Sequence, residues 1–244
     1  MKNILQYIAI LFVVSVVLVY VLKYRELNTQ ENSILLDVTE SNMTTLSTED
    51  LQSISAVPMQ SFFDDDGNGE NTRVSIINEL SRNSFVEASV KPVAFKLFVN
   101  EIVRKQEISN YWRNINSAIT NTSLQKKDRQ RTNLYLPIAR ELERLNEIEF
   151  AQKRNLIVVS DGMIADGEIS FYDPKTLEDL KRNPSKYIKL LNERYPLKSI
   201  EKVKVIWVFT PNDVATSEQF EIVIKFWEQL ITEKQGTFTL TTNL

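Results

Sequence analysis

The stretch Ser33-Ile34-Leu35-Leu36-Asp37-Val38-Thr39-Glu40-Ser41 decides how this chain is interpreted. Its first half is a short apolar run, typical of a central parallel strand that is covered on both faces. Its second half places one acid and two hydroxyls at alternate positions: Asp37, Thr39 and Ser41. Because a turning loop can direct alternate side chains at one point, the stretch predicts a strand that ends in a divalent-cation site. The pattern is common in proteins, so its weight depends on the rest of the chain.

Two later segments add to it. Arg131-Thr132-Asn133-Leu134 stands at the start of a predicted helix, and residues 155–162 (NLIVVSDG) form a second apolar strand that ends near Asp161. Strands alternate with helices along the chain, which predicts an α/β fold with a doubly wound, mostly parallel sheet. Ligands of such sheets bind beyond the carboxyl ends of the strands, where the strand order reverses. Asp37 and Asp161 are both predicted at such ends.

This order of an acid, two hydroxyls, a threonine and an aspartate resembles the metal-ion-dependent adhesion site of von Willebrand factor A domains. The resemblance covers residues 32–244. It implies a Rossmann-like fold with a six-stranded sheet, in which the strands that carry the two aspartates are neighbours. It also implies a set of oxygen ligands for the cation: Asp37, Thr39, Ser41, Thr132 and Asp161.

The composition restricts the metal to ions that prefer oxygen. The 244 residues include no cysteine and no histidine, which excludes thiol nucleophiles, Ser-His-Asp triads, Cys/His zinc sites and disulfides. Carboxylate and hydroxyl oxygens suit Mg²⁺ first, with Mn²⁺ and Ca²⁺ as alternatives. The resemblance implies that the ion would accept an Asp or Glu from a protein partner. The alternative interpretation is that Asp37, Thr132 and Asp161 only cap helices.

A membrane anchor is predicted at the N-terminus, where residues 4–22 (ILQYIAILFVVSVVLVYVL) are almost entirely apolar. At about 1.5 Å per residue this run reaches about 29 Å, close to the hydrocarbon thickness of a bilayer. Tyr20-Val-Leu-Lys-Tyr-Arg offers no small-residue cleavage site, so an uncleaved anchor is favoured over a signal peptide. Lys2 on one side nearly balances Lys23 and Arg25 on the other. The missing cysteines favour a domain outside the cytoplasm.

The chain is therefore divided into a tip (1–3), a transmembrane anchor (4–22), a linker (23–31) and a domain similar to von Willebrand factor A domains (32–244). The domain's predicted strands are 34–37, 73–78, 85–90, 156–160, 203–209 and 237–242, with 85–90 as an antiparallel edge. Its predicted helices are 47–57, 94–118 with Ile102 facing inward, 134–149, 177–193 and a final helix around 220–231 that Gly236 caps.

Three functions compete. The first is a membrane-anchored, non-enzymatic protein-binding module that acts through the cation. The second is a metal-independent scaffold subunit of a membrane-associated complex. The third is a metal-dependent phosphohydrolase, which is disfavoured because Thr39 stands where such enzymes need a second carboxylate. A net charge of −3 argues against nucleic-acid binding, which depends on neutralising phosphates.

Overall fold

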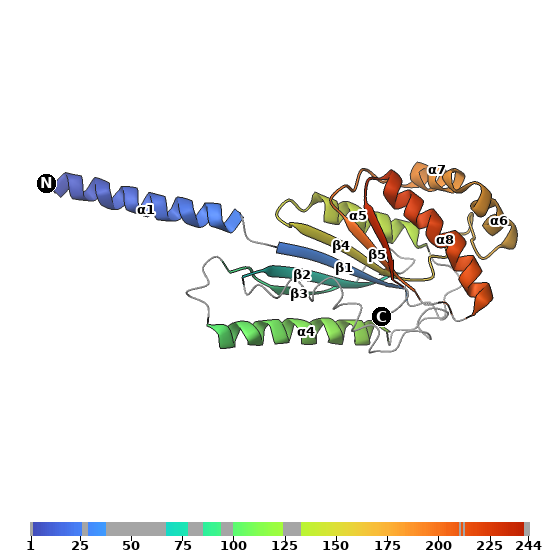
Figure 1. Ribbon diagram of the computed structural model, residues 1–244, viewed down its shortest axis with the longest axis horizontal. Helices are drawn as coiled ribbons and strands as arrows, with labels where there is room; N and C mark the ends of the chain where they lie inside the picture. The colour runs from blue at the N-terminus through green and yellow to red at the C-terminus, as the bar shows by residue number, and fades with distance from the viewer. Residues whose placement is uncertain are drawn as a thin grey trace.

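The computed structural model describes residues 2–25, 29–37, 67–77, 85–93, 100–123, 133–209, 211 and 213–241. Its strands are β1 (Thr29–Asp37), β2 (Gly69–Ile77), β3 (Phe85–Val90), β4 (Lys153–Val159), β5 (Lys204–Val208) and β6 (Thr237–Thr241). Its helices are α1 (Lys2–Arg25), α4 (Glu101–Ser123), α5 (Tyr135–Glu147), α6 (Pro174–Arg182), α7 (Pro184–Arg194) and α8 (Val214–Glu233) (Figure 1). The helix predicted at 47–57 lies outside the described residues.

The six strands form one mixed sheet in the order β3-β2-β1-β4-β5-β6. All neighbouring pairs are parallel except β2 and β3, which are antiparallel. The sheet therefore confirms the predicted α/β class, the neighbouring first and fourth strands, and the antiparallel edge at residues 85–90. Its order is that of a Rossmann-like doubly wound sheet, with β1 and β4 on either side of the point where the order reverses.

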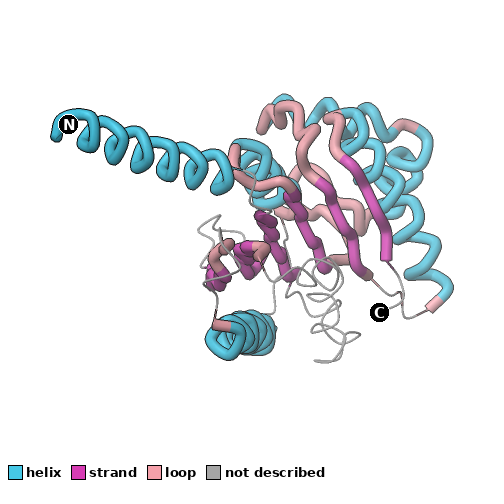
Figure 2. The backbone as a smooth tube through the Cα atoms, turned by 60° about the vertical axis from the view of Figure 1, so that its left-hand side comes forward, coloured by secondary structure: helices cyan, strands magenta, loops and turns pink. Residues whose placement is uncertain are grey.

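Helices cover both faces of the sheet. α4 packs against β2 and β3 on one face, whereas α5 packs on β1 and β4, and α8 on β6, on the other (Figures 1 and 2). The central strands are apolar on both sides: Leu35 and Leu156 belong to the α5 side, and Ile34 and Ile157 to the α4 side. Burial on both faces explains why these strands read as continuous apolar runs.

Several element boundaries differ from the prediction. β1 begins at Thr29 and β2 at Gly69, so both strands start with polar residues that precede the predicted strands 34–37 and 73–78. The predicted helix 177–193 is two helices, because Pro184 starts α7 at its first turn. Ile102 was wrongly placed inward: its side chain is 78% exposed, and Tyr111 and Ile115 form the buried face of α4.

The end of α8 also differs in detail. Gln235, with φ 68°, and not Gly236 is the residue in the left-handed conformation. The Gly236 N–H donates to the Ile231 carbonyl at 2.9 Å and the Gln235 N–H to the Thr232 carbonyl at 2.9 Å, which is a Schellman motif. Gly236 is needed for space, since a Cβ there would lie 2.9 Å from Ile231 and from Ile200.

α1 extends away from the domain at the end where β1 begins (Figure 1). Among the residues that the structure describes, no helix is both long and apolar enough to cross a membrane. The described side chains of α1 are those of residues 6, 7 and 10–19. The anchor at residues 4–22 therefore stays a prediction.

Candidate functional site

The candidate site lies at the carboxyl ends of β1 and β4. Asp37 is the last residue of β1, and Asp161 follows β4 by two residues. In the β1–β4 register Leu36 pairs with Val159, so the next residues, Asp37 and Ser160, lie side by side. This is the point where the strand order reverses, which is where doubly wound sheets bind their ligands.

Ser160 joins the two strand ends. Its Oγ donates a hydrogen bond to Asp37 Oδ2 at 2.8 Å and accepts one from the Gly162 N–H at 3.0 Å. Ser160 is fully buried, and Asp37 is only 1% exposed. A carboxylate held this far from water needs polar partners, and the hydroxyl of Ser160 is one of them.

Asp161 stabilises its own turn. Its Oδ1 accepts from the Met163 N–H at 2.9 Å, and its Oδ2 accepts from the Tyr172 hydroxyl at 3.3 Å. Asp161 is 8% exposed, whereas Tyr172 is 50% exposed. The carboxylate therefore lies just beneath the surface. One of its oxygens accepts from a backbone N–H, and the other accepts from the half-exposed Tyr172 side chain.

Two tryptophans hold the turn that carries Asp161. The Trp207 Nε1–H donates to the Ser160 carbonyl at 2.8 Å, and the Trp227 Nε1–H donates to the Gly162 carbonyl at 3.0 Å. Gly162 has φ 78°, and a Cβ on it would lie 2.9 Å from Val223 Cγ1. The turn thus requires glycine for both its conformation and its space.

The start of α5 faces the same edge. Arg144, near the end of α5, lies 4.0 Å from Glu31 near the start of β1, so the helix runs antiparallel to the strand. The first described residues before α5 are Asn133, whose Oδ1 accepts from the Leu136 N–H at 3.4 Å, and Leu134, which is fully buried. The predicted ligands Thr39, Ser41 and Thr132 lie outside the described residues.

The oxygen atoms of Asp37 and Asp161 are of the chemical type that a hard cation prefers as ligands. Asp37 and Asp161 supply carboxylate oxygens on neighbouring strands, and an ionised carboxylate has about four acceptor positions, so the hydrogen bonds above are compatible with a cation. Within the described ranges, no group of three or more acidic residues forms a metal cluster.

Sequence reasoning missed two members of this region. Ser160 was read only as the end of a strand, and Tyr172 was not considered. Ser160 has a signal in the sequence, because it directly precedes Asp161 in NLIVVSDG and strand ends at the reversal point lie side by side. Tyr172 has none, since it reaches Asp161 from a separate turn.

A second polar region lies at the opposite, amino edge of the sheet. Asn32 Oδ1 accepts from Gln30 Nε2 at 2.9 Å and from Asn155 Nδ2 at 2.8 Å, while Asn32 Nδ2 donates to Thr72 Oγ1 at 3.1 Å and to Glu70. All five side chains are buried. Of these residues, Gln30 belongs to the predicted linker (23–31), and Glu70 and Thr72 precede the predicted strand 73–78.

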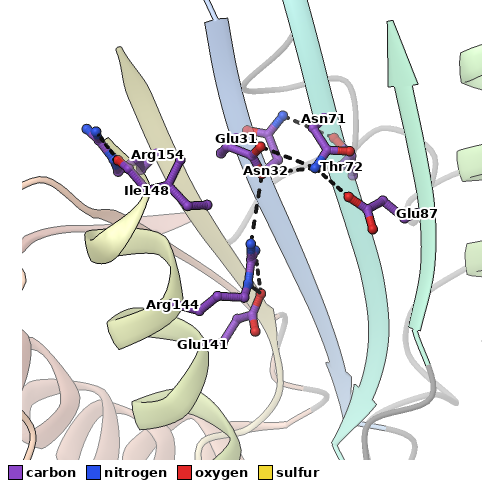
Figure 3. A network of polar contacts seen from close by, with 9 residues as sticks. All are labelled: Glu31, Asn32, Asn71, Thr72, Glu87, Glu141, Arg144, Ile148 and Arg154. Atoms are coloured by element: carbon purple, nitrogen blue, oxygen red, sulfur yellow. Dashed lines mark hydrogen bonds and ion pairs between the residues drawn. The ribbon is translucent and has the colours of Figure 1, made fainter. Parts of the chain in front are cut away.

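Burial raises the pKa of acidic side chains at this edge. Loss of hydration raises the pKa of Glu70 to about 7, although hydrogen bonds from Tyr111 and Asn32 oppose the shift. The Tyr111 hydroxyl lies 2.6 Å from Thr72 Oγ1, and burial raises its pKa as well. On the other face burial raises the pKa of Glu31, which accepts from Asn71 Nδ2 at 3.2 Å (Figure 3).

No protein-family model matches this chain, and no curated protein is significantly similar to it.

Proposed function

We propose that this chain is a membrane-anchored binding module that resembles a von Willebrand factor A domain. In this proposal, a divalent cation at the carboxyl edge of β1 and β4 accepts an Asp or Glu side chain from a protein partner. The observation that carries the proposal is that Ser160 joins Asp37 to the turn that carries Asp161, at the point where the strand order reverses. Mg²⁺ is the first choice because only oxygen ligands are present in the predicted set.

The proposed ligand set combines described and predicted residues. Asp37 and Asp161 would hold the ion directly or through water, and Thr39 and Ser41 would follow Asp37 on the same loop. Thr132 would complete the set. The cation would supply a positive charge that attracts a carboxylate.

The membrane anchor is the second part of the proposal. The described apolar side chains of α1, from Ile10 to Val19, are between 50% and 70% exposed and occur on all sides of the helix. A helix that is apolar all round is typical of a membrane span or a buried helix, and α1 extends away from the domain (Figure 1). We place the chain in a cell membrane with the domain on the extracytoplasmic side.

A metal titration of the detergent-solubilised full chain tests the cation. Mg²⁺, Mn²⁺ and Ca²⁺ are compared by calorimetry and by thermal unfolding, with EDTA as the reference. An ion at 100 times its dissociation constant should add about 2.7 kcal/mol of stability, or about 5–10 °C for a domain of this size. Asp37→Asn and Asp161→Asn should each abolish the gain, whereas Glu228→Gln, an exposed carboxylate on α8, should retain it.

A metal-independent scaffold is the competing function. It is favoured by the hydrogen bonds of Asp161, which satisfy the Met163 N–H and stabilise the local turn without any ion. If none of the three ions raises the unfolding temperature of the wild-type chain, the cation proposal fails and the scaffold is preferred.

A further inference from the structure

A pocket of about 400 Å³ opens at the amino edge of the sheet, opposite the candidate cation site. Four of its ten lining residues are basic, Lys153, Arg154, Lys202 and Lys204, and one is acidic, Glu201. Its volume lies within the range of about 300–1,000 Å³ that is usual for small-ligand sites. The chain as a whole is acidic, with a net charge of −3, so this concentration of positive charge is local.

Three residues that line the pocket, Asn155, Lys204 and Thr237, belong to a polar row that crosses the sheet. Asn32 pairs with Asn155, Asn155 with Lys204, and Lys204 with Thr237, so these side chains lie level on four neighbouring strands. Paired residues of parallel strands project from the same face. The next row inward contains Ile34, Ile157 and Ile206, all buried. The polar row therefore lies between this apolar row and the amino edge of the sheet, and Ile206 of the apolar row also lines the pocket.

The amide lining of the pocket is rigid and rich in donors. Asn155, which lines the pocket, donates one amide hydrogen to Asn32 at 2.8 Å, and its amide group carries a second. Gln30 also lines the pocket and is tied to Asn32 at 2.9 Å. These amides belong to the buried network that extends to Glu70, so their orientation is fixed before any ligand arrives.

The basic side chains divide into two roles. Arg154 Nε donates to the Ile148 carbonyl at 2.8 Å, which fixes Arg154 as part of the wall (Figure 3). Lys202 and Lys204 are exposed, and neither forms an ion pair with another described residue. Lysine ammonium groups are compact charges that suit phosphate oxygens.

The pocket lies on the side of the domain from which α1 leaves. Gln30 of the pocket is five residues after Arg25, the end of α1, so the chain between them spans at most about 18 Å. Figure 1 shows α1 joining the domain at the start of β1. If α1 lies in a membrane, the amino edge faces the lipid headgroups.

We propose that this pocket binds a phosphate group, supplied by the headgroup of an anionic phospholipid. The phosphate chemistry follows from the pocket alone, whereas the lipid source rests on the anchor of the proposed function. Lys202 and Lys204 neutralise the phosphate, and the amides of Asn155 and Gln30 donate to its oxygens. An anionic lipid held here would fix the orientation of the domain on the membrane.

The test uses the full chain in zwitterionic detergent. Native mass spectrometry counts bound phosphatidylglycerol, with phosphatidylcholine as the neutral comparison. The variant Lys202→Gln/Lys204→Gln is compared with Lys175→Gln/Lys181→Gln, which removes the same charge from exposed positions on α6. Near a membrane each lysine contributes about a fivefold factor, so the pocket variant should bind phosphatidylglycerol about 25-fold more weakly, and the control should match wild type.

A second arm separates the two sources of phosphate. Inorganic phosphate is added to the same proteins at matched ionic strength, and thermal unfolding is followed. Saturable stabilisation that only the pocket variant loses, without preference for phosphatidylglycerol, would support the phosphate site and assign it a soluble ligand. Equal behaviour of the pocket variant and the control in both arms would overturn the proposal. Because Asp37 and Asp161 are intact in all these proteins, failure here is independent of the metal titration.

Discussion

Replacing Glu70 by glutamine should stabilise the domain above neutral pH and have little effect below pH 5. Burial raises the pKa of Glu70 in the folded chain to about 7, from an ordinary value of 4.5. The folded state therefore retains a proton that the unfolded state releases, and stability falls as pH rises from about 4.5 to 7. Glutamine has nearly the same shape as the protonated acid and cannot ionise, so the variant should not show this loss.

The magnitude follows from the two pKa values. Each pH unit between them is worth about 1.4 kcal/mol, so ionised Glu70 costs the folded state about 3 kcal/mol at pH 8. Glu70 is only 3% exposed, so screening by solvent reduces this cost little. At about 2–4 °C per kcal/mol for a domain of this size, Glu70→Gln should unfold about 6–12 °C higher than wild type at pH 8.

The composition limits the number of other groups that titrate in this pH range. The chain has no histidine and no cysteine, so neither contributes a titration between pH 5 and 8.5. Glu31, whose pKa burial also raises, is common to both proteins and cancels in the comparison. Trp207 and Trp227 are fully buried in the domain, and α1 contains no tryptophan, so tryptophan fluorescence follows the domain alone.

The experiment records thermal unfolding of the detergent-solubilised full chain by fluorescence from pH 5 to 8.5. Wild type and Glu70→Gln should coincide at the acidic end and separate as pH rises. Glu228→Gln, an exposed carboxylate on α8, is the control and should follow wild type. Parallel curves for wild type and Glu70→Gln, or a variant that is less stable at pH 8, would refute the link between burial and the pKa of Glu70.

Three further substitutions test the geometry by urea denaturation at pH 7. Gly162→Ala should cost about 2 kcal/mol or more, since φ is 78° and the new Cβ would lie within 3.2 Å of Trp227. Ser160→Ala should cost about 1–3 kcal/mol because it removes the hydroxyl that donates to the buried Asp37. Asn32→Leu should cost about 2 kcal/mol or more, because several buried partners lose a hydrogen bond. An unchanged unfolding midpoint would contradict the contact at that residue.

The apolar pattern predicted the middle of the sheet well and its ends poorly. The apolar runs Ile34–Leu36 and Leu156–Val159 are typical of strands that are covered on both faces. These strands and the α/β class could therefore be predicted from the sequence. Thr29–Asn32 and Gly69–Thr72 are polar, and polarity ordinarily indicates a loop. They are strands here because Asn32, Glu70 and Thr72 satisfy one another, which no single segment reveals.

The candidate site was partly accessible for a similar reason. Asp37 and Asp161 were predicted at strand ends, and the structure places those ends on the neighbouring strands β1 and β4. The hydrogen bond between Ser160 and Asp37 joins residues 123 positions apart, and it depends on the strand register. The sequence contains no local signal for that register.

The polar row at the amino edge fixes the strand register, which the apolar runs alone set only weakly. A strand that is apolar on both faces can shift along its neighbours without exposing a hydrophobic residue, so burial alone sets its register weakly. A shift of β1 by two residues would place Asn32 beside Ile157 or Lys153, away from Asn155. The buried amide would then lose partners at a cost of about 1–3 kcal/mol for each unsatisfied group. Because the same register brings Asp37 level with Ser160, the amides at one edge fix the alignment on which the carboxylates at the other depend.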